Sequence, residues 1–385
     1  MKRVFIIQNT PLNEPLPLSI YLTGLLSNFK SDDKFEINLI VAKSKSISTN
    51  IKNICNTIFQ IKSSTYSIKD NIKFSLKVSS ILKKENLLKK IDIVHCLYPN
   101  SSLMGAVLFK ILNNRKLNLI YDVRSPWIDM SIQRGFINSY FSEIFRKLVY
   151  LQEKILCKCV DKFIFISEGL KKYYSQNISM NKYQKVFISP SGVDLNLFKR
   201  VKTNIRQIHG VKKDEVLIGS VGGIAKVRKL NEFLHLFKDL VTKNKKVKLM
   251  FVGGGDDLIN LKQLTKKLNL ESYVIFTGQV EHKEVPKYIS AFDYGLSHIP
   301  NIFIYENSFP LKVLEYLACG VPVLASELKA HREISKQLKG IYVYRNSDDI
   351  LGFIKTTRTL IKQDMSRWDW VSLVDSYKVI WKNEN

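Results

Sequence analysis

Two charged side chains, Lys312 and Glu315, lie three residues apart in the stretch 307–326. In a helix this spacing places both on one face. Pro310 suits the first turn of such a helix, whose free backbone N–H groups can hold a phosphate. The residue types and their spacing therefore predict an anion-binding helix start with a carboxylate beside it.

The residues around this pair supply the elements that would position it. Asn307 or Ser308 can cap the helix, and Gly320 can end it in the left-handed conformation. Residues 321–324 form an apolar run that suits a buried parallel strand. The stretch thus predicts a loop, a helix, a glycine stop and a strand. An ordinary helix–strand unit with a surface glutamate is the alternative interpretation.

A second group of charges follows a strand that enters a glycine turn over 216–223. The loop 222–229 carries two glycines and three cations: Gly222, Gly223, Lys226, Arg228 and Lys229. Glycines let a phosphate approach the backbone, and the cations can neutralise it. The loop matches neither the G-x-G-x-x-G fingerprint nor the Walker P-loop, so an ordinary turn is an equally good interpretation.

Taken whole, the stretch 307–326 resembles the nucleotide-sugar site of the retaining GT-B glycosyltransferases of family 4. The second Glu of the E-x7-E motif in that family holds the donor ribose, and Glu315 matches it. Pro310 and Lys312 complete the P-x-K-x-x-E variant of the motif. Asn307 stands where the first Glu is usual, and Glu306, one position away, could substitute.

The resemblance implies a full set of donor contacts. The residues that it assigns to catalysis are Arg228, Lys229, Glu306 and Asn307. The residues that it assigns to donor binding are Gly222, Gly223, Val280, Phe309, Pro310, Leu311, Lys312 and Glu315. The family commonly has an Arg after the first glycine of the basic loop, where this chain has Gly223. Residues 252–255 resemble the family's V-G-x-G turn, which a tight structural turn explains equally well.

The acceptor-side candidates lie in the first half of the chain. Residues 121–127 resemble the Y-D-x-R-x-x-W segment of some family 4 enzymes and place Asp122 and Arg124 at a strand end, where parallel sheets bind ligands. An Asp–Arg pair that fixes the loop is the alternative interpretation. His95 also lies at a strand end. Thr10 lies in a first loop without the glycine pair of many relatives, and could contact the diphosphate instead.

The chain alternates short apolar runs with amphipathic segments, which predicts βαβ units on parallel sheets. A length of 385 residues suggests two domains. We expect an α/β, GT-B fold of two Rossmann-like, doubly wound domains with an interdomain cleft. Residues 1–190 would bind the acceptor and 191–365 the nucleotide sugar, and a helix in 366–385 would cross back. Its predicted inner face is Trp368, Val371, Val374, Tyr377 and Trp381.

The net charge of +26 points to an anionic partner, although a Lys-, Asn- and Ile-rich bias typical of an AT-rich coding sequence explains part of it. No helix-turn-helix, zinc or RNP-like pattern appears, so no nucleic acid is expected. A helix predicted over 136–158 mixes aromatic residues with cations. It could rest on an anionic membrane surface, or pack on the core with a solvated basic side.

Neither an H-E-x-x-H nor a D-x-D motif occurs, so we expect no metal and no cofactor. Five scattered cysteines argue against a disulfide framework. No apolar run reaches the ~18 residues that span a bilayer, and the first residues lack signal-peptide features. These observations predict a cytoplasmic protein, with peripheral attachment to the inner face of the cell membrane as an option.

The family resemblance implies transfer of a sugar from a nucleoside diphosphate sugar, of the UDP or GDP type, to a hydroxyl of a glycan or lipid-linked acceptor. The reaction would retain anomeric configuration and serve cell-surface polysaccharide or glycolipid synthesis. Two alternatives stay open: a nucleotide-sugar epimerase on the same fold, and a basic nucleic-acid-binding protein. Product analysis with and without an acceptor distinguishes an epimerase from a glycosyltransferase. Salt-dependent binding to nucleic acid would identify a nucleic-acid-binding protein.

Overall fold

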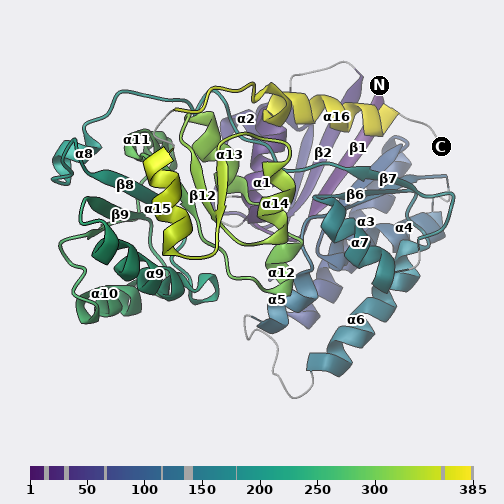
Figure 1. The fold of residues 1–385 in the computed structure, drawn as a ribbon. Coiled ribbons are helices and arrows are strands. Elements are labelled where there is room, and N and C mark those ends of the chain that lie inside the picture. The colour runs from purple at the N-terminus through teal and green to yellow at the C-terminus, as the bar shows by residue number, and fades with distance from the viewer. Residues whose placement is uncertain are drawn as a thin grey trace. The chain divides into compact units, whose positions relative to one another are not determined.

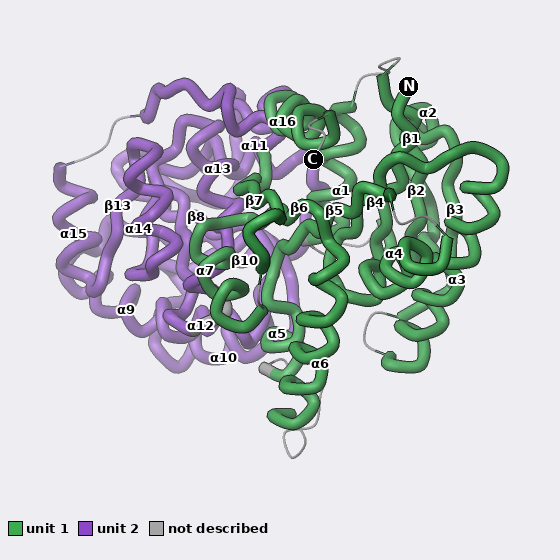
Figure 2. Tube along the Cα trace, turned by 90° about the vertical axis from the view of Figure 1, so that its right-hand side faces the viewer, with its two compact units in different colours: residues 1–192, 370–385 green, residues 193–369 purple. Residues whose placement is uncertain are grey.

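The computed structural model describes residues 1–12, 17–29, 34–64, 67–113, 116–133, 142–178, 180–356 and 360–382. The chain divides into two compact units, Met1–Gly192 with Trp370–Asn385, and Val193–Asp369 (Figure 2). The sequence-based boundaries lie at 190/191 and 365/366. Within unit 2 the two ends of the segment meet, since Val193 and Asp369 form a parallel bridge and the Val193 N–H donates to the Trp368 carbonyl (2.9 Å).

Unit 1 is built on a seven-stranded parallel sheet with the order β3-β2-β1-β4-β5-β6-β7. Figure 1 labels β1, β2, β6 and β7 of this sheet. Its strands are β1 Lys2–Gln8, β2 Phe35–Ala42, β3 Thr57–Ile61, β4 Ile93–Leu97, β5 Asn118–Val123, β6 Lys162–Phe165 and β7 Lys185–Ile188. The central strands are apolar throughout because helices cover both faces of a parallel sheet. The strand order switches direction between β1 and β4, so loops diverge at the carboxyl ends of these two strands.

The helices of unit 1 fall in two layers. They are α1 Pro17–Ser27, α2 Thr49–Ile54, α3 Ile68–Leu88, α4 Asn100–Asn113, α5 Trp127–Gln133, α6 Ser142–Cys157, α7 Glu168–Asn177 and α16 Trp370–Lys382. Helices α1 and α16 pack on one face of the sheet. Helix α4 packs between α3 and α6 in the other layer. The first residues of the helix predicted over 136–158 lie outside the described residues.

The C-terminal helix corrects one expectation. Helix α16 begins at Trp370, two residues after the predicted Trp368, which lies in the 3₁₀ turn η4 (Ser366–Trp368) and in unit 2. Val371 is exposed, so the predicted inner face is wrong at these two positions. The face that packs on unit 1 consists of Trp370, Leu373, Val374, Tyr377, Ile380 and Trp381.

Unit 2 is built on a six-stranded parallel sheet with the order β10-β9-β8-β11-β12-β13. Its strands are β8 Val216–Val221, β9 Val247–Val252, β10 Val274–Gly278, β11 Tyr294–Ser297, β12 Val323–Ser326 and β13 Ile341–Tyr344. This is the doubly wound order, with the switch between β8 and β11. The expected α/β class with two doubly wound parallel sheets is therefore confirmed.

Helices also cover both faces of the sheet in unit 2. One core contains α9 Leu230–Lys243, α10 Leu258–Lys267 and α15 Ser347–Thr356. The other contains α11 Val285–Ala291, α13 Leu311–Ala318 and α14 Lys329–Ser335. The short helices are α8 Ile205–Ile208, η2 Lys226–Arg228, η3 His282–Glu284 and α12 Phe303–Glu306. Of these, η2 follows β8 and α12 follows β11, so both lie near the switch in strand order.

Candidate functional site

Helix α13 carries Lys312 and Glu315 at the carboxyl edge of the unit 2 sheet. The helix begins after Pro310, which provides no side-chain cap. Ser308 donates its hydroxyl to the Tyr305 carbonyl instead (2.9 Å), so the predicted capping by Asn307 or Ser308 is wrong because the helix starts later. The predicted left-handed stop at Gly320 is confirmed, with φ of 73°.

The first turn of α13 is less open than the sequence suggests. The N–H groups of Leu311 and Val313 donate to the carbonyls of Phe309 and Pro310, each at 3.0 Å. These local bonds occupy two of the N–H groups that a helix start leaves free. A ligand at this end would therefore rely more on side chains than on the backbone.

Tyr316 fixes α13 against the sheet. Its buried hydroxyl accepts from the Val221 N–H (2.9 Å) and donates to the Leu296 carbonyl (3.3 Å). Gly295 makes room for the ring, since a Cβ there would lie 2.4 Å from it. Tyr316 thus joins the ends of β8 and β11 at the switch point and orients the adjacent Glu315. Its sequence context is that of any core aromatic, so no signal in the sequence identifies this role.

Lys312 and Glu315 are half-buried and lack a bonded partner among the described residues. Burial raises the pKa of the Glu315 carboxyl to about 7, against the attraction of Lys312. Burial also lowers the pKa of the Lys312 ammonium to about 7, and repulsion from Arg228 adds to this effect. A polar ligand that bonds to Lys312 and Glu315 would offset the cost of desolvating these two groups, so both are suited to binding such a ligand.

The loop that carries Arg228 and the glycines starts beside α13, since Val221, the residue before Gly222, donates its N–H to Tyr316. The positive charge of Arg228 helps to lower the pKa of Lys312, so the guanidinium lies close enough to repel the Lys312 ammonium. A Cβ on Gly222 or Gly223 would meet nothing within 4 Å, and Gly222 has a φ of 117° that favours glycine. The loop backbone is therefore open to a ligand. Lys229, in contrast, pairs its ammonium with Glu232 (3.2 Å).

Two of the glycines at 253–255, Gly253 and Gly255, have a structural explanation, since a Cβ on either would collide with backbone. A Cβ on Gly253 would lie 2.1 Å from the carbonyl oxygen of Gly222. In this close approach the Gly222 N–H donates to the Val252 carbonyl (2.9 Å), and the Ile224 N–H donates to the Gly254 carbonyl (2.8 Å). The V-G-x-G turn therefore packs against the basic loop and hydrogen-bonds to it, which fixes the position of the loop backbone.

The other predicted donor residues all lie in unit 2. Asn307 is buried, and Glu306 is half-buried at the end of α12. Phe309 stacks on Trp368, with ring centroids 5.6 Å apart, and Val280 packs on the same core. Among the predicted charged residues, the structure brings together Arg228, Lys312 and Glu315. The roles of the remaining residues stay predictions.

Two buried histidines near this edge bond to the protein itself. His331 joins the Ser297 hydroxyl (2.9 Å) and the Ser326 carbonyl (2.8 Å), which ties β11 to β12. His298 bonds to the Tyr344 hydroxyl (2.8 Å). Burial lowers the pKa of each imidazole to about 4, so both are neutral at pH 7. Their contacts explain them as structural groups.

The acceptor-side candidates lie inside unit 1, in one polar network. The Arg124 Nε lies 2.7 Å from Asp122 Oδ1, and its Nη2 donates to Asp122 Oδ2 at 3.0 Å. His95 Nε2 lies 3.3 Å from the same carboxylate, and Tyr377 of α16 donates its hydroxyl to it at 2.9 Å. Tyr21 of α1 donates to this carboxylate at 3.2 Å, and its ring lies 3.7 Å from the Arg124 guanidinium carbon.

This network is closed to solvent. His95 and Asp122 are fully buried, Arg124 is 9% exposed, and Thr10 is buried as well. Burial alone would raise the pKa of the Asp122 carboxyl, but Arg124 and His95 lower it overall. The contacts match the alternative interpretation, an Asp–Arg pair that fixes the loop. These side chains are therefore buried within unit 1, and their contact with an acceptor stays a prediction.

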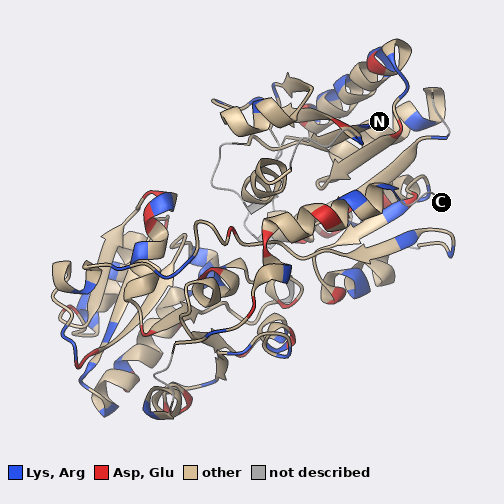
Figure 3. Cartoon of the chain, turned by 90° about the horizontal axis from the view of Figure 1, so that it is seen from above, with Lys and Arg blue, Asp and Glu red and all other residues tan. Residues whose placement is uncertain are grey.

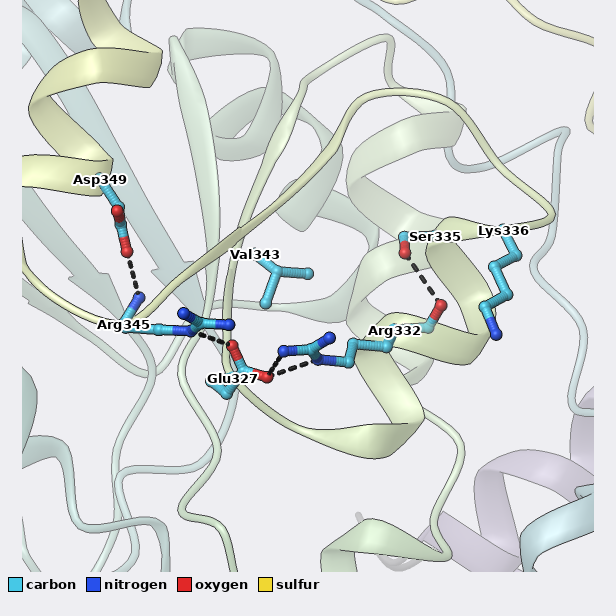
Figure 4. A pocket seen from close by; sticks show the side chains of 7 residues that line it. All are labelled: Glu327, Arg332, Ser335, Lys336, Val343, Arg345 and Asp349. Carbon is cyan, nitrogen blue, oxygen red and sulfur yellow. Dashed lines mark hydrogen bonds and ion pairs between the residues drawn. The ribbon is translucent and has the colours of Figure 1, made fainter.

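A depression of about 480 Å³ on unit 2 is separate from the charged group on α13. Figure 4 shows its lining, in which Glu327 bridges Arg332 and Arg345. The Arg345 Nε lies 2.9 Å from Glu327, and the Arg345 N–H donates to Asp349 (2.8 Å). Glu327, Arg332 and Arg345 thus satisfy one another, and only the exposed Lys336 in this lining has no bonded partner among the described residues.

Within the described residues, no group of three or more His, Cys, Asp or Glu side chains could hold a metal ion. The five cysteines are free. No helix in the described part of the chain is both long enough and apolar enough to cross a membrane.

Known structures with the same architecture define the class. Sucrose-phosphate synthase from Thermosynechococcus elongatus matches with a TM-score of 0.74, 17% identity and coverage of 99% of this chain and 98% of that one. Anabaena HepE in complex with UDP matches with a TM-score of 0.70 and 17% identity, and the match covers 99% of each chain. These similarities identify the fold as GT-B, as expected.

Two family models then match the sequence. The model for Glycosyltransferase Family 4 matches residues 35–197, and that for Glycosyl transferases group 1 matches residues 201–370. The chain therefore belongs to the family 4-like GT-B glycosyltransferases, and the family resemblance drawn from the sequence is confirmed.

The curated relatives agree with this assignment. An uncharacterized glycosyltransferase of Methanocaldococcus jannaschii is 27% identical over 269 residues, which are 68% of this chain and 64% of the relative. The capsular polysaccharide biosynthesis glycosyltransferase CapM of Staphylococcus aureus is 27% identical over 67% of this chain and 63% of its own length. The O-antigen biosynthesis glycosyltransferase WclY of Escherichia coli is 25% identical, with 75% and 76% covered. The chain thus spans less than two thirds of the first two relatives.

Proposed function

We propose that this protein transfers a sugar from a nucleoside diphosphate sugar to a hydroxyl of a glycan or lipid-linked acceptor, with retention of anomeric configuration. The observation that carries the proposal is the group formed by Arg228, Lys312 and Glu315 beside the open loop at Gly222. Cations without bonded partners suit a diphosphate, and a carboxylate without a partner suits ribose hydroxyls.

In the proposed reaction, the bond between the anomeric carbon and the diphosphate breaks on the face where the acceptor oxygen attacks. The leaving phosphate oxygen takes the acceptor proton, so no residue needs to be a covalent nucleophile. Arg228 and Lys312 would offset the charge that grows on the diphosphate, and Glu315 would hold the ribose. Glu306 or Asn307 would orient the donor sugar, since both follow β11 at the same edge.

The comparisons favour this choice of substrates. HepE structures hold UDP and UDP-glucose, which makes a uridine nucleotide a reasonable first ligand for this chain. CapM and WclY are named for capsular polysaccharide and O-antigen biosynthesis, so a role in cell-surface polysaccharide or glycolipid synthesis is part of the proposal. The proposal also includes a GDP-type donor as the alternative to UDP, and a reaction that needs no metal ion. It further includes a cytoplasmic location and an anionic membrane surface as partner.

A thermal-shift screen with UDP, GDP and ADP, with and without added Mg²⁺, tests the donor site. One of these nucleotides should raise the melting temperature, because a ligand that binds only the folded state stabilises it. Glu315→Ala should weaken that nucleotide's binding by about 10- to 100-fold, the loss expected for hydrogen bonds to a charged group. The exposed Glu271→Ala of the same unit is the matched control. Equal binding by Glu315→Ala and wild type would refute the proposal.

A further inference from the structure

The outward face of α6 in unit 1 is an apolar stripe. Its four members are well exposed, at 61, 58, 56 and 58% of their surface: Ile144, Leu148, Leu151 and Ile155. Their spacing of four, three and four residues aligns them along one side of the helix over roughly 16 Å. Large side chains that are more than half exposed and form a continuous row usually mark a contact surface rather than chance exposure.

The inward face of α6 is firmly held, so the stripe is not a sign of a loosely packed helix. Val149, Glu153 and Cys157 are buried on that side. The Tyr121 hydroxyl of β5 donates to Glu153 (2.6 Å), and the Tyr150 hydroxyl donates to Asp129 of α5 (2.5 Å). The helix therefore presents its stripe in a fixed orientation.

Cations run along one side of the stripe. Lys147, Lys154 and Lys158 are exposed and fall on the flank next to the apolar row. Glu143 is the nearest exposed acidic residue on the helix, and it pairs with Arg146 (2.9 Å). Lys and Arg residues are dispersed over both units (Figure 3), so cations alone do not distinguish α6; their combination with an exposed apolar row does.

Helix α3 repeats the pattern in the same layer. Ile68, Ile72 and Leu76 are 59, 49 and 56% exposed. Each is followed directly by an exposed lysine: Lys69, Lys73 and Lys77. Because α4 packs against both α3 and α6, the two stripes belong to one helical layer of unit 1. Two helices that share this combination offer a broader contact than one.

We propose that the α6 stripe, supported by α3, docks on an anionic phospholipid bilayer. Apolar side chains would enter the boundary between headgroups and acyl chains, and the lysines would contact the phosphates. A second copy of the chain is a poorer occupant, since two such faces would bring their lysine rows together and repel. The inference rests on the proposed function for its purpose, which is to bring a lipid-linked acceptor within reach.

Vesicle flotation of the full-length protein tests the docking surface. Wild type should bind vesicles of phosphatidylglycerol and phosphatidylcholine, and bind phosphatidylcholine alone far less. Leu148→Asp/Leu151→Asp should lower the affinity for the mixed vesicles by about tenfold or more, since it removes apolar insertion and adds repulsion. Ile208→Asp/Ile259→Asp is the matched control, because both residues are exposed apolar side chains of unit 2; it should bind like wild type.

A second variant separates the two contributions. Lys147→Glu/Lys154→Glu/Lys158→Glu should abolish the preference for phosphatidylglycerol while leaving the fold intact, since all three lysines are exposed. Each variant should keep the wild-type thermal shift with nucleotide, which shows that unit 2 is unaffected. Absence of that shift in wild type would contradict the proposed function and leave the vesicle result to stand on its own.

Three results would overturn the docking inference. One is a wild-type protein that does not float with the mixed vesicles at low salt. Another is a Leu148→Asp/Leu151→Asp variant that binds as wild type does. The third is analytical ultracentrifugation that finds a wild-type dimer which this variant dissociates, without any vesicle binding; the stripe would then be covered by a second copy.

Discussion

The two sheets share a strand order, yet the charges at their carboxyl edges differ in one respect. In unit 1, Asp122 and Arg124 neutralise each other in a closed network beneath α1 and α16. In unit 2, Lys312 and Glu315 are held half-buried without bonded partners among the described residues. Paired buried charges satisfy one another and depend on each other within the fold, whereas charges that are partly desolvated and unpaired are candidates for binding a ligand. The same edge of the same architecture thus carries a structural network in one unit and the proposed binding group in the other.

The largest expected effect comes from breaking the closed network. Asp122→Ala should lower the free energy of unfolding by about 3–5 kcal/mol, because the Arg124 guanidinium would stay buried without its counter-charge. Denaturant unfolding followed by tryptophan fluorescence measures this, since Trp370 and Trp381 pack in unit 1. Asp214→Ala, which breaks the exposed pair with Lys246, should lower the free energy of unfolding far less. Similar losses for both variants would remove the contrast between the units.

The next effect has the opposite sign and lies in unit 2. Burial raises the pKa of Glu315 from its ordinary value to about 7. The free energy of unfolding therefore falls as the pH rises from about 4.5 to 7, and the whole penalty for ionising the buried carboxyl applies above pH 7. Glu315→Gln should therefore raise the free energy of unfolding of the ligand-free protein at pH 8 by about 1–3 kcal/mol. The same variant at pH 4 should differ little from wild type. A destabilised variant at pH 8 would show that Glu315 serves the fold.

Two glycine substitutions sharpen the distinction between a supporting turn and an open one. Gly253→Ala should destabilise by about 1–3 kcal/mol, since its Cβ would collide with the Gly222 carbonyl and its φ of 144° is strained for alanine. Gly223→Ala meets no neighbour and should change stability by less than about 0.5 kcal/mol. Only nucleotide affinity should fall in Gly223→Ala. Calorimetric unfolding and binding titrations of both variants provide the comparison, and unchanged affinity in Gly223→Ala would place the ligand elsewhere.

The smallest expected effect is a pH profile. Affinity for a nucleotide sugar should be highest near pH 7, because Glu315 becomes protonated below that value and Lys312 loses its proton above it. We expect a fall of severalfold by pH 5.5 and by pH 9, measured by isothermal titration. Lys312→Arg keeps its charge at high pH, so it should flatten the alkaline side alone. A flat profile in wild type would mean that neither group meets the ligand.

Much of this arrangement can be predicted from the sequence because it depends on local patterns. Apolar runs ending in glycines indicate the strands, and the spacing of Pro310, Lys312 and Glu315 indicates a helix with both charges on one face. The start of α13 is a local feature too, but the capping prediction was wrong because Asn307 and Ser308 lie before a turn at Phe309 and Pro310 that has no distinct pattern.

What the sequence cannot reveal depends on contacts between distant residues. Tyr316 fits against Gly295, twenty-one positions earlier, and Tyr377 reaches Asp122 across most of the chain. Asp122 and Arg124 have the residue types and the strand-end position of ligand-binding groups. Helices α1 and α16 bury them, and each of these helices supplies a tyrosine hydroxyl that bonds to Asp122. Charge type and spacing alone therefore do not separate a site from a structural pair.

The pairing of Val193 with Asp369 has a further consequence for the architecture. The segment between them begins and ends at neighbouring points, has its own sheet and core, and carries Arg228, Lys312 and Glu315. It is therefore an insertion whose removal leaves no long gap to bridge, the arrangement under which a segment can be cut out and still fold. Residues 193–369 produced alone should form a small nucleotide-binding protein, free of any acceptor chemistry.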